Sequence, residues 1–517
     1  MNVMERFDRD TDTRALIQVL GPAPRAERTH RQLLENVSSL CIELRRRGVQ
    51  PGDRVLILSG LLIQTLESML AAFNLGAVAV PVNPLLGASN IEAIIRSLAP
   101  ACCIFEEGLQ PELAATLEPC CRLYISLKLR DAPGSSGWLP YESLLDEPSM
   151  PLARPEHVDD TPALIVYSSG SEGRPKGISM THGSLATFLH HYDMLCSQFE
   201  PGASPARPPS PLVTVLPLSH LGGLGICLQG LMSGRTTYLM SPFLPEPYLR
   251  LLAAARCSLM MLVPSLYRSL LKEPSLPELD LSALRFCMTL GEACSAEFAA
   301  QIETAFAATA VSAYGLTECL TGIGHSRQEL YAGGVKRGSC GTHCFGEVRL
   351  VDEHGQENAG VGELWVRNPT VRECYLDPEL NGSRFAQGWF RTKDLFQRDA
   401  DGHYFHRGRC DDMFVCNGKN IYPAEIEVLL MSHPAIELAC AAPVMSKDNR
   451  TLPAVLILPR QPITEAEVLE YSAKAGPAHA IPQMIRFATS CPQVGPGKID
   501  RVEAHRLLQD AYDQAHP

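Results

Sequence analysis

Short apolar runs alternate with helix-like segments along most of this 517-residue chain, and this alternation limits the folds that it can adopt. Strands that alternate with helices form parallel sheets whose faces the helices cover. Residues 62–75 predict an amphipathic helix between the apolar runs 54–59 and 77–82, and residues 90–98 predict a second helix before the run 101–105. The apolar runs that predict strands are 54–59, 77–82, 101–105, 213–216, 259–263 and 284–289. We therefore expect an α/β fold with parallel-type sheets.

The character of the chain changes after residue 346, where turn-separated short strands are predicted at 348–351, 362–366 and 403–406. This pattern indicates a small β subdomain. A domain boundary is expected next to Arg409, which divides the chain into domains 1–409 and 410–517. The second domain is predicted to be small and α+β. Its predicted elements are a helix at 423–432, a strand at 454–458 and helices at 463–475 and 502–511.

Two segments are rich in residues that disfavour regular structure. Residues 131–140 contain Pro, Gly and Ser, and residues 201–211 contain several prolines. Both are therefore predicted to be loops.

Composition excludes several classes of function. A hydrophobic content of 45% and a charged content of 20% are typical of a globular protein. The formal net charge of -12 disfavours nucleic acid as a main partner, since binding phosphate backbones requires a basic surface. No segment reaches the roughly 18 consecutive apolar residues of a membrane helix. The charged amino terminus has no apolar signal core, so a cytoplasmic location is expected.

The 18 cysteines do not resemble a disulfide framework, because adjacent pairs such as Cys102–Cys103 occur among them. Cys340 and Cys344 flank His343, which suggests a metal site. The spacing does not match a structural zinc site and no second ligand pair follows, so ordinary thiols are the favoured interpretation.

A loop rich in serine and glycine, residues 167–177, follows the apolar run 163–166. Hydroxyl groups and glycine N–H groups bind phosphate oxygens, and Lys176 adds positive charge. The spacing differs from a P-loop, because Pro175 precedes the lysine and Gly177 follows it. The loop indicates a nucleoside triphosphate site, with a flexible surface loop as the alternative.

Further residues with ligand chemistry lie in short segments downstream. Tyr314, Thr317 and Glu318 bring together a ring, a hydroxyl and a carboxylate, which suit a purine, a phosphate and Mg²⁺. A single carboxylate such as that of Asp394 is a common ligand of a ribose. Lys498 lies on a loop flanked by glycine. Taken one at a time, each is more often a turn residue, a helix cap or a solvated charge.

The order of these motifs resembles the adenylate-forming superfamily, which includes acyl- and aryl-CoA synthetases, adenylation domains of peptide synthetases and luciferase-like enzymes. The resemblance extends from about residue 28 to the last predicted helix and includes the runs 48–55, 76–84 and 418–427. It implies a large α/β N-terminal domain and a small mobile C-terminal domain. It also implies ATP-dependent, AMP-forming activation of a carboxylic acid to an acyl-adenylate, followed by formation of a thioester.

The resemblance implies that scattered residues hold the ATP. These are Ser168, Ser169, Gly170, Ser171, Gly173 and Lys176 for the phosphates, Gly291, Glu292, Ala293 and Tyr314 for adenine, and Asp394 and Arg409 for the ribose.

The resemblance also implies roles in catalysis. Thr317 would contact the α-phosphate, and Glu318 would bind Mg²⁺. Lys498 would bridge the carboxylate and the α-phosphate during adenylation. Asp411 would be the hinge about which the small domain then rotates, bringing residues 417–422 to the site for attack by a thiol.

Residues 215–225 resemble the segment of the superfamily that gates the acid pocket, which implies that His220 takes the gate position, followed by Gly222 and Gly223. This segment is apolar and has no aspartate to pair with an α-ammonium group, whose burial alone is costly. We therefore expect a fatty, aryl or similar simple acid rather than an α-amino acid. No carrier domain follows Lys498, so coenzyme A is the expected acceptor. Phosphopantetheine on a separate acyl carrier protein is the alternative.

Two positions depart from the pattern of the superfamily. Glu172 stands where threonine is commonest, and Lys393 stands where glycine is commonest. Three hypotheses remain. The first is an acid–thiol ligase, and the second is an adenylating enzyme of another kind, such as a luciferase-like oxygenase or a carrier-protein loader. The third, which Glu172 and Lys393 motivate, is a non-catalytic nucleotide-binding relative.

Overall fold

The computed structural model describes most of the chain. The described residues are Met4, Phe7, 11–20, 23–106, 121–127, 138–145, 159–168, 175–199, 209–319, 322–416, 419–448, 450–476, 481–492 and 499–516.

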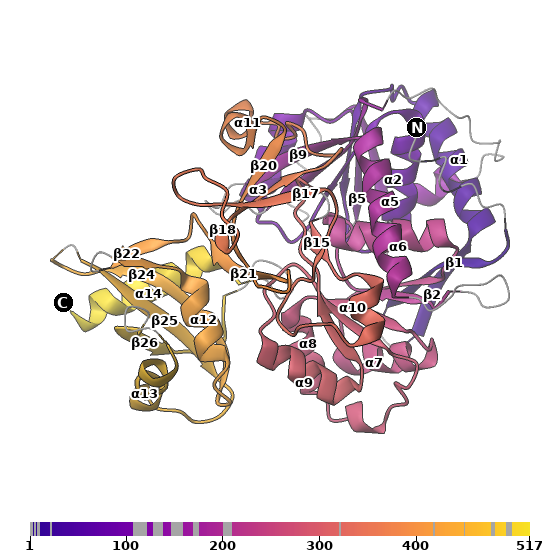
Figure 1. The fold of residues 1–517 in the computed structure, drawn as a ribbon. Coiled ribbons are helices and arrows are strands. Elements are labelled where there is room, and N and C mark those ends of the chain that lie inside the picture. The colour runs from indigo at the N-terminus through magenta and orange to yellow at the C-terminus, as the bar shows by residue number, and fades with distance from the viewer. Residues whose placement is uncertain are drawn as a thin grey trace.

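A seven-stranded sheet in the order β7-β6-β5-β3-β4-β8-β9 lies in the first half of the chain (Figure 1). Neighbouring strands are parallel except for β8 and β9. The central strands are buried along nearly their whole length, which requires the continuous apolar runs seen in the sequence. Their bounds are β3 Arg54–Leu58, β4 Val78–Val82, β5 Cys102–Glu106, β6 Leu123–Leu127, β7 Leu139–Pro140, β8 Pro162–Ser168 and β9 Lys176–Thr181.

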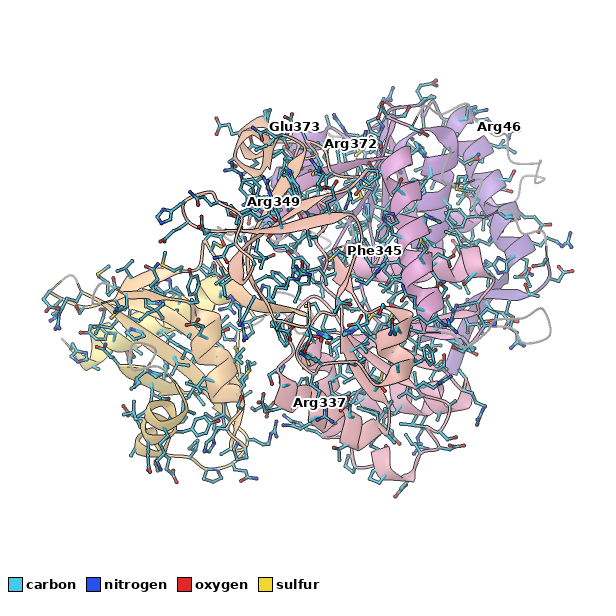
Figure 2. All side chains as sticks on the ribbon, in the orientation of Figure 1. Arg46, Arg337, Phe345, Arg349, Arg372 and Glu373 are labelled. Carbon is cyan, nitrogen blue, oxygen red and sulfur yellow. The ribbon has the colours of Figure 1, made fainter. Side chains whose placement is uncertain are left out.

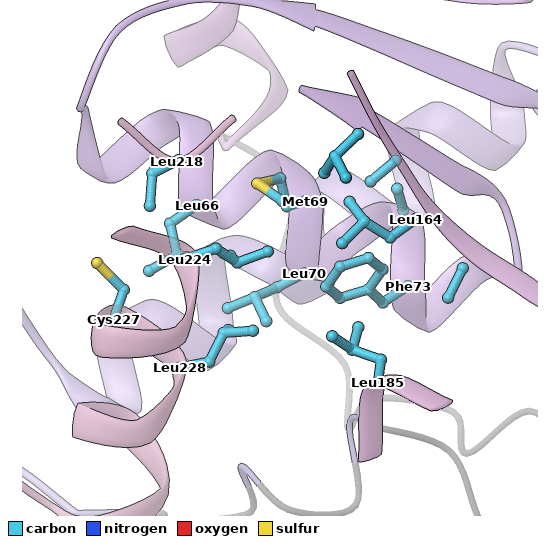
Figure 3. Close-up of a cluster of buried hydrophobic side chains, with 14 of the residues drawn as sticks. Leu66, Met69, Leu70, Phe73, Leu164, Leu185, Leu218, Leu224, Cys227 and Leu228 are labelled. Atoms are coloured by element: carbon cyan, nitrogen blue, oxygen red, sulfur yellow. The ribbon is translucent and has the colours of Figure 1, made fainter. Parts of the chain in front are cut away.

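Helix α2 (Ile63–Leu75) is a core helix, which corrects the prediction of an amphipathic one. Every residue of α2 except Gln64 is buried. Its apolar side chains face β8 and two further helices in Figure 3. The helices around the first sheet are α1 His30–Arg46, α3 Ala88–Leu98, α5 His182–Gln198 and α6 Leu221–Ser233. The short 3-10 turn η3 is Tyr141–Leu144.

Two further sheets follow in the N-terminal region, which we define as residues 4–409. One has the order β10-β11-β1-β2, and the other is the parallel sheet β12-β13-β14. The sequence did not predict β1 and β2, and the predicted strand at 213–216 is shorter than expected. The strands are β1 Arg14–Leu20, β2 Ala23–Thr29, β10 Leu212–Thr214, β11 Thr237–Met240, β12 Leu259–Leu262, β13 Phe286–Thr289 and β14 Thr309–Ser312. The helices are α7 Pro245–Ala254, α8 Pro264–Leu271 and α9 Ala296–Phe306, with the 3-10 turn η4 at Leu276–Glu278.

Antiparallel strands complete the N-terminal region, as the predicted β subdomain requires. β15 pairs with β16, while β17, β18, β20, β19 and β21 form one sheet. The strands are β15 Ile323–Gly324, β16 His343–Cys344, β17 Glu347–Val351, β18 Val361–Arg367, β19 Phe385–Ala386, β20 Trp389–Arg398 and β21 Tyr404–Arg409. Helices α10 Arg327–Ala332 and α11 Pro378–Arg384 accompany them.

The C-terminal region, residues 410–516, has its own sheets and its own hydrophobic clusters. This arrangement accords with a small α+β unit, and the division at residues 409 and 410 stays a prediction. The strands are β22 Phe414–Cys416, β23 Lys419–Ile421, β24 Ile436–Met445, β25 Thr451–Pro459 and β26 Met484–Phe487. The helices are α12 Pro423–Met431, α13 Glu465–Ala475 and α14 Arg501–Ala515.

The predicted loops fall mostly outside the described residues. Residues 131–137 and 201–208 are not described, whereas Leu139–Pro140 form β7 and so correct the end of the first predicted loop. Among the described residues, no helix is long and apolar enough to cross a membrane. Within the same residues, the cysteines are free thiols and no three His, Cys, Asp or Glu side chains are grouped to bind a metal ion.

Candidate active site

The carboxyl ends of β13 and β14 bring two predicted nucleotide segments to one edge of a sheet. The two strands are parallel neighbours, so the residues that follow them lie at the same edge. Gly291 follows β13 with a φ of 78°, a left-handed conformation that favours glycine. The next residues are Glu292 and Ala293, and Tyr314 follows β14. The segments predicted to surround adenine therefore lie together.

Tyr314 is joined to Asp394, although 80 residues separate them in the chain. The Tyr314 hydroxyl donates to Asp394 Oδ2 at 2.5 Å. The Tyr314 ring lies edge-on to Phe396, with the ring centroids 4.7 Å apart. Burial, and then the negative charge of Asp394, raise the pKa of Tyr314 well above its ordinary value. The hydroxyl is therefore a fixed donor that orients the carboxylate.

Asp394 is also paired with Arg409, because β20 and β21 place the two residues opposite each other. Arg409 Nη1 lies 3.3 Å from Asp394 Oδ1, and His406 Nε2 lies 3.6 Å from the same oxygen. Asp394 is buried. A carboxylate has about four acceptor positions, so this one can still accept bonds from the two hydroxyls of a ribose. The sequence did not single out His406.

Arg409 connects this carboxylate to the predicted hinge. Its Nε and Nη2 each donate to the Asp411 carboxylate at 2.8 Å. Burial lowers the pKa of Arg409, but its bonds to Asp411 and the charge of Asp394 outweigh burial and raise it. Burial raises the pKa of Asp411, and the bonds from Arg409 outweigh this effect and lower it. A continuous series of ion pairs therefore joins the predicted ribose and hinge residues.

Glu318 is joined to the strand that follows the predicted phosphate loop. The Tyr375 hydroxyl donates to Glu318 Oε1 at 2.6 Å. Backbone hydrogen bonds of 2.7 and 2.9 Å join residues 374–376 to β9, which begins at Lys176. Tyr375 therefore connects the predicted metal ligand to the strand that follows the predicted phosphate loop. No motif pointed to Tyr375, because its role depends on a strand nearly 200 residues away.

Gly177 permits this close approach, because a Cβ there would lie 2.7 Å from Leu376 Cδ1.

Thr317 lies in the turn just before Glu318 and is partly buried. The backbone of Ser168 pairs with Lys176 in the β8–β9 ladder. Several predicted site residues lie outside the described residues, namely Ser169, Gly170, Ser171, Gly173 and Lys498, together with Glu172.

The predicted acid-binding segment forms the start of α6. His220 is the residue before α6 and is exposed. A Cβ on Gly222 would meet Leu290 Cδ1 at 3.4 Å, so α6 begins beside the residue that precedes Gly291. A Cβ on Gly223 would lie 2.4 Å from two backbone oxygens, so this position requires glycine. The segments for acid and nucleotide are therefore neighbours.

Aromatic side chains near α6 were not predicted from the sequence. Tyr192 on α5 lies within 3.3 Å of the Cβ position of Gly225. The rings of His191 and Phe345 have centroids 5.8 Å apart. Phe345 is buried, and Figure 2 labels it near the middle of the view of the N-terminal region. Burial, and then His190, lower the pKa of His191, which keeps this ring neutral at pH 7.

Comparisons with known proteins find relatives that match nearly the whole chain. A family model described as AMP-binding enzyme matches residues 4–376. A feruloyl-CoA synthase of an Amycolatopsis species is 30% identical, over 92% of this chain and 93% of the relative. An indoleacetate–CoA ligase of Aromatoleum aromaticum is 27% identical over 94% of each chain. A long-chain-fatty-acid–CoA ligase of Mycobacterium tuberculosis is 26% identical, over 91% of this chain and 90% of the relative.

Solved structures share the fold over the whole length. An anthranilate CoA ligase in complex with anthranoyl-AMP has a TM-score of 0.86 at 23% identity, covering 99% of this chain and 98% of the other. A benzoate CoA ligase from Burkholderia xenovorans has a TM-score of 0.83 at 23% identity, covering 98% of this chain and 100% of the other. These solved structures therefore share the α/β fold described above.

Proposed function

Because the chain belongs to the AMP-binding enzyme family, we propose that it is an AMP-forming acid–CoA ligase. The enzyme activates a simple carboxylic acid with ATP to an acyl-adenylate and transfers the acyl group to coenzyme A. The observation that carries the proposal is the hydrogen-bonded chain Tyr314–Asp394–Arg409–Asp411, which gathers the predicted nucleotide and hinge residues from distant parts of the sequence.

In this proposal, Asp394 and Arg409 hold the ribose, and Tyr314 lies against the base. Tyr314 and Arg409 fix the Asp394 carboxylate before the nucleotide arrives, so little ordering remains to oppose binding. Gly291 lets the backbone after β13 come close to the base.

The phosphates belong beside β9, where Lys176 supplies positive charge together with the serines and glycines of residues 168–173. Thr317 contacts the α-phosphate. Glu318 suits Mg²⁺, because it is a hard oxygen ligand and, among the described residues, only Tyr375 donates to it, at Oε1. Mg²⁺ commonly keeps waters and phosphate oxygens as its other ligands, so one protein carboxylate is sufficient. When bound, the ion would neutralise charge on the phosphates.

The acid belongs next to His220 and Gly222. Asp193, the carboxylate nearest along α5 to the aromatic side chains, accepts a hydrogen bond from Gln229 at 3.0 Å. Gln229 lies two turns along α6 from Gly222, about 10 Å away, so Asp193 is not placed to pair with an α-ammonium group there. The ring of Tyr192, which lies beside Gly225 at the start of α6, favours an aryl or arylalkanoic acid within the wider class of simple acids.

Lys498 promotes adenylation, and rotation about Asp411 then brings residues 417–422 to the site for attack by the thiol. Residues next to Lys498 are held near the hinge, because Arg501 forms two 2.7 Å bonds with Glu427 on α12 and its charge acts on Asp412. Phosphopantetheine on a carrier protein stays the alternative acceptor, and the cytoplasmic location stays a prediction.

A pyrophosphate-release screen over fatty, aryl and amino acids tests the proposal. We expect release with aryl or fatty acids, none with α-amino acids, and an acyl-CoA product when CoA is added. A carrier-protein loader would release pyrophosphate but form no acyl-CoA. A non-catalytic relative would bind ATP but would not release pyrophosphate with any acid of the panel. That result would contradict the proposal.

A further inference from the structure

We propose that Arg268, Lys272 and Glu437 form an orientation latch, which holds the C-terminal region in the arrangement described here and connects that arrangement to the nucleotide segment 291–293. The inference rests on the proposed function, because it assigns the latch to one of the two half-reactions.

Helix α12 contacts the N-terminal region at both of its ends. At its start, Ala424 lies so close to Gly408 on β21 that a Cβ on Gly408 would be 2.9 Å from the Ala424 Cβ. At its end, Met431 Sδ lies 3.7 Å from Arg268 Nη2. The nine residues of α12 span about 13 Å, so these contacts define the orientation of the helix. A rotation about the hinge at Asp411 must separate the far contact.

Two cations of the N-terminal region face the end of α12. The Arg268 guanidinium lies 4.6 Å from the centroid of the Phe298 ring on α9. Lys272, just after α8, forms a 2.5 Å ion pair with Glu437 near the start of β24. Glu437 is mostly buried in the present orientation, and rotation would separate it from Lys272. The contact therefore favours the present orientation over a rotated one.

The same contact reaches the predicted nucleotide segment. A small cavity between the two regions is lined by Arg268, Ala293 and Ser295 on one side and by Met431, Glu437 and Arg460 on the other. Burial lowers the pKa of Arg268, and the charges of Glu292 and Glu437 oppose this shift from opposite sides. A nucleotide that moves residues 291–293 would therefore change how the C-terminal region packs against the N-terminal region. By linkage, the orientation of the C-terminal region would change nucleotide affinity in turn.

The orientation itself indicates which half-reaction the latch serves. Strand β22 runs away from the N-terminal region in Figure 1. The segment assigned to the thiol step follows β22, so the present arrangement is not the one that presents that segment. The latch consequently favours the adenylation step.

The test compares Arg268→Met and Lys272→Met with the matched control Arg285→Met. Arg285 also stacks on an aromatic ring, 5.3 Å from the centroid of Tyr331, but lies outside the contact with the C-terminal region. Each variant is measured for acid-dependent pyrophosphate exchange, for acyl transfer from supplied acyl-adenylate to CoA, and for hydrogen exchange of residues 423–437. A melting curve checks that each variant folds.

We expect latch variants to lose pyrophosphate exchange by roughly threefold or more, to transfer acyl groups at an equal or higher rate, and to exchange amide hydrogens of residues 423–437 faster. The double variant Lys272→Glu/Glu437→Lys should restore much of what Lys272→Glu loses. Equal loss in both half-reactions, or hydrogen exchange matching the control, overturns the latch. If wild type lacks pyrophosphate exchange with any acid, the proposed function fails, and hydrogen exchange alone still decides the latch.

Discussion

At the scale of single residues, Lys393 shows why a substitution can persist beside the carboxylate that is predicted to bind the ribose. Its φ is 63°, in the left-handed region that side chains with a Cβ rarely adopt. Its N–H donates to Glu363 Oε1 at 3.0 Å, and its carbonyl accepts from the Cys410 N–H at 2.7 Å. These bonds hold the strained backbone next to Asp394. The departure from glycine noted in the sequence therefore costs stability without displacing the site.

We predict that Lys393→Gly raises the free energy of unfolding by about 1 kcal/mol, because glycine adopts this φ without strain. Lys419→Gly, on the exposed strand β23, should instead lower it, since glycine there only adds freedom to the unfolded chain. Urea unfolding measures both. A destabilised Lys393→Gly would show that the lysine side chain contributes more than its backbone strain costs.

We further predict that Asp394→Asn raises the KM for ATP about tenfold or more, since a hydrogen bond to a charged group contributes about 1.5–3 kcal/mol. Steady-state kinetics at saturating acid measures this. Asp513→Asn, on the exposed end of α14, is the matched control and should leave the KM unchanged. An unchanged KM in Asp394→Asn would remove this residue from the nucleotide site.

The sequence could predict most residues of the candidate site but not the partners that contact them. Tyr314, Asp394 and Arg409 lie in recognisable motifs, and the structure brings them together. Tyr375 and His406 lie in no such motif, since only the folded chain places them beside Glu318 and Asp394.

At the scale of elements, α2 shows what an apolar pattern leaves undetermined. The run 62–75 predicted the helix correctly, but not its burial on nearly every side. Burial on this scale puts Glu67 in the core at 0% exposure, where it accepts bonds from Arg28, Asn36 and Tyr141. One carboxylate thus joins β2, α1, α2 and η3. The periodicity of the apolar residues in the sequence does not predict these polar contacts.

We predict that Glu67→Ala lowers the free energy of unfolding by about 3 kcal/mol, because it leaves three polar partners without their acceptor. Glu35→Ala, at an exposed position on α1, should change it by less than about 0.5 kcal/mol. Urea unfolding followed by circular dichroism compares the two. Similar small effects for both would contradict the role given to Glu67.

A second buried carboxylate makes stability depend on pH. Burial raises the pKa of Glu329 on α10, but the His325 ring 3.5 Å away and hydrogen bonds from Ser326 and Thr342 outweigh burial and lower it to about 2. A carboxylate with a lowered folded pKa contributes stability above its unfolded pKa of about 4.3, and this is lost as the pH falls toward 2.

We therefore expect Glu329→Gln to be less stable than wild type at pH 7, with the difference shrinking between about pH 5 and pH 3. Melting temperatures across this range measure the difference, and Glu353→Gln in the exposed turn after β17 serves as the control. A difference that does not change with pH would show that shape, and not charge, is what Glu329 supplies.

At the scale of the whole molecule, the site depends on contacts between segments far apart in sequence. Strand–helix alternation was enough to predict the class of fold, because buried parallel strands need continuous apolar runs. It could not predict the sheet formed by β1 and β2, since β1 pairs with β11 more than 200 residues away. The same limit applies to the α12 contact with Arg268, which joins the two regions.

The central claim is that residues from both regions act together to attach AMP to a carboxylic acid. Acid-dependent exchange of labelled pyrophosphate into ATP tests it most directly, in wild type and in Lys498→Ala. The account predicts exchange in wild type with at least one aryl or fatty acid. It also predicts a loss of several orders of magnitude in the variant, which still forms thioester from supplied acyl-adenylate. Absence of exchange in wild type, or equal loss of both half-reactions in the variant, would contradict it.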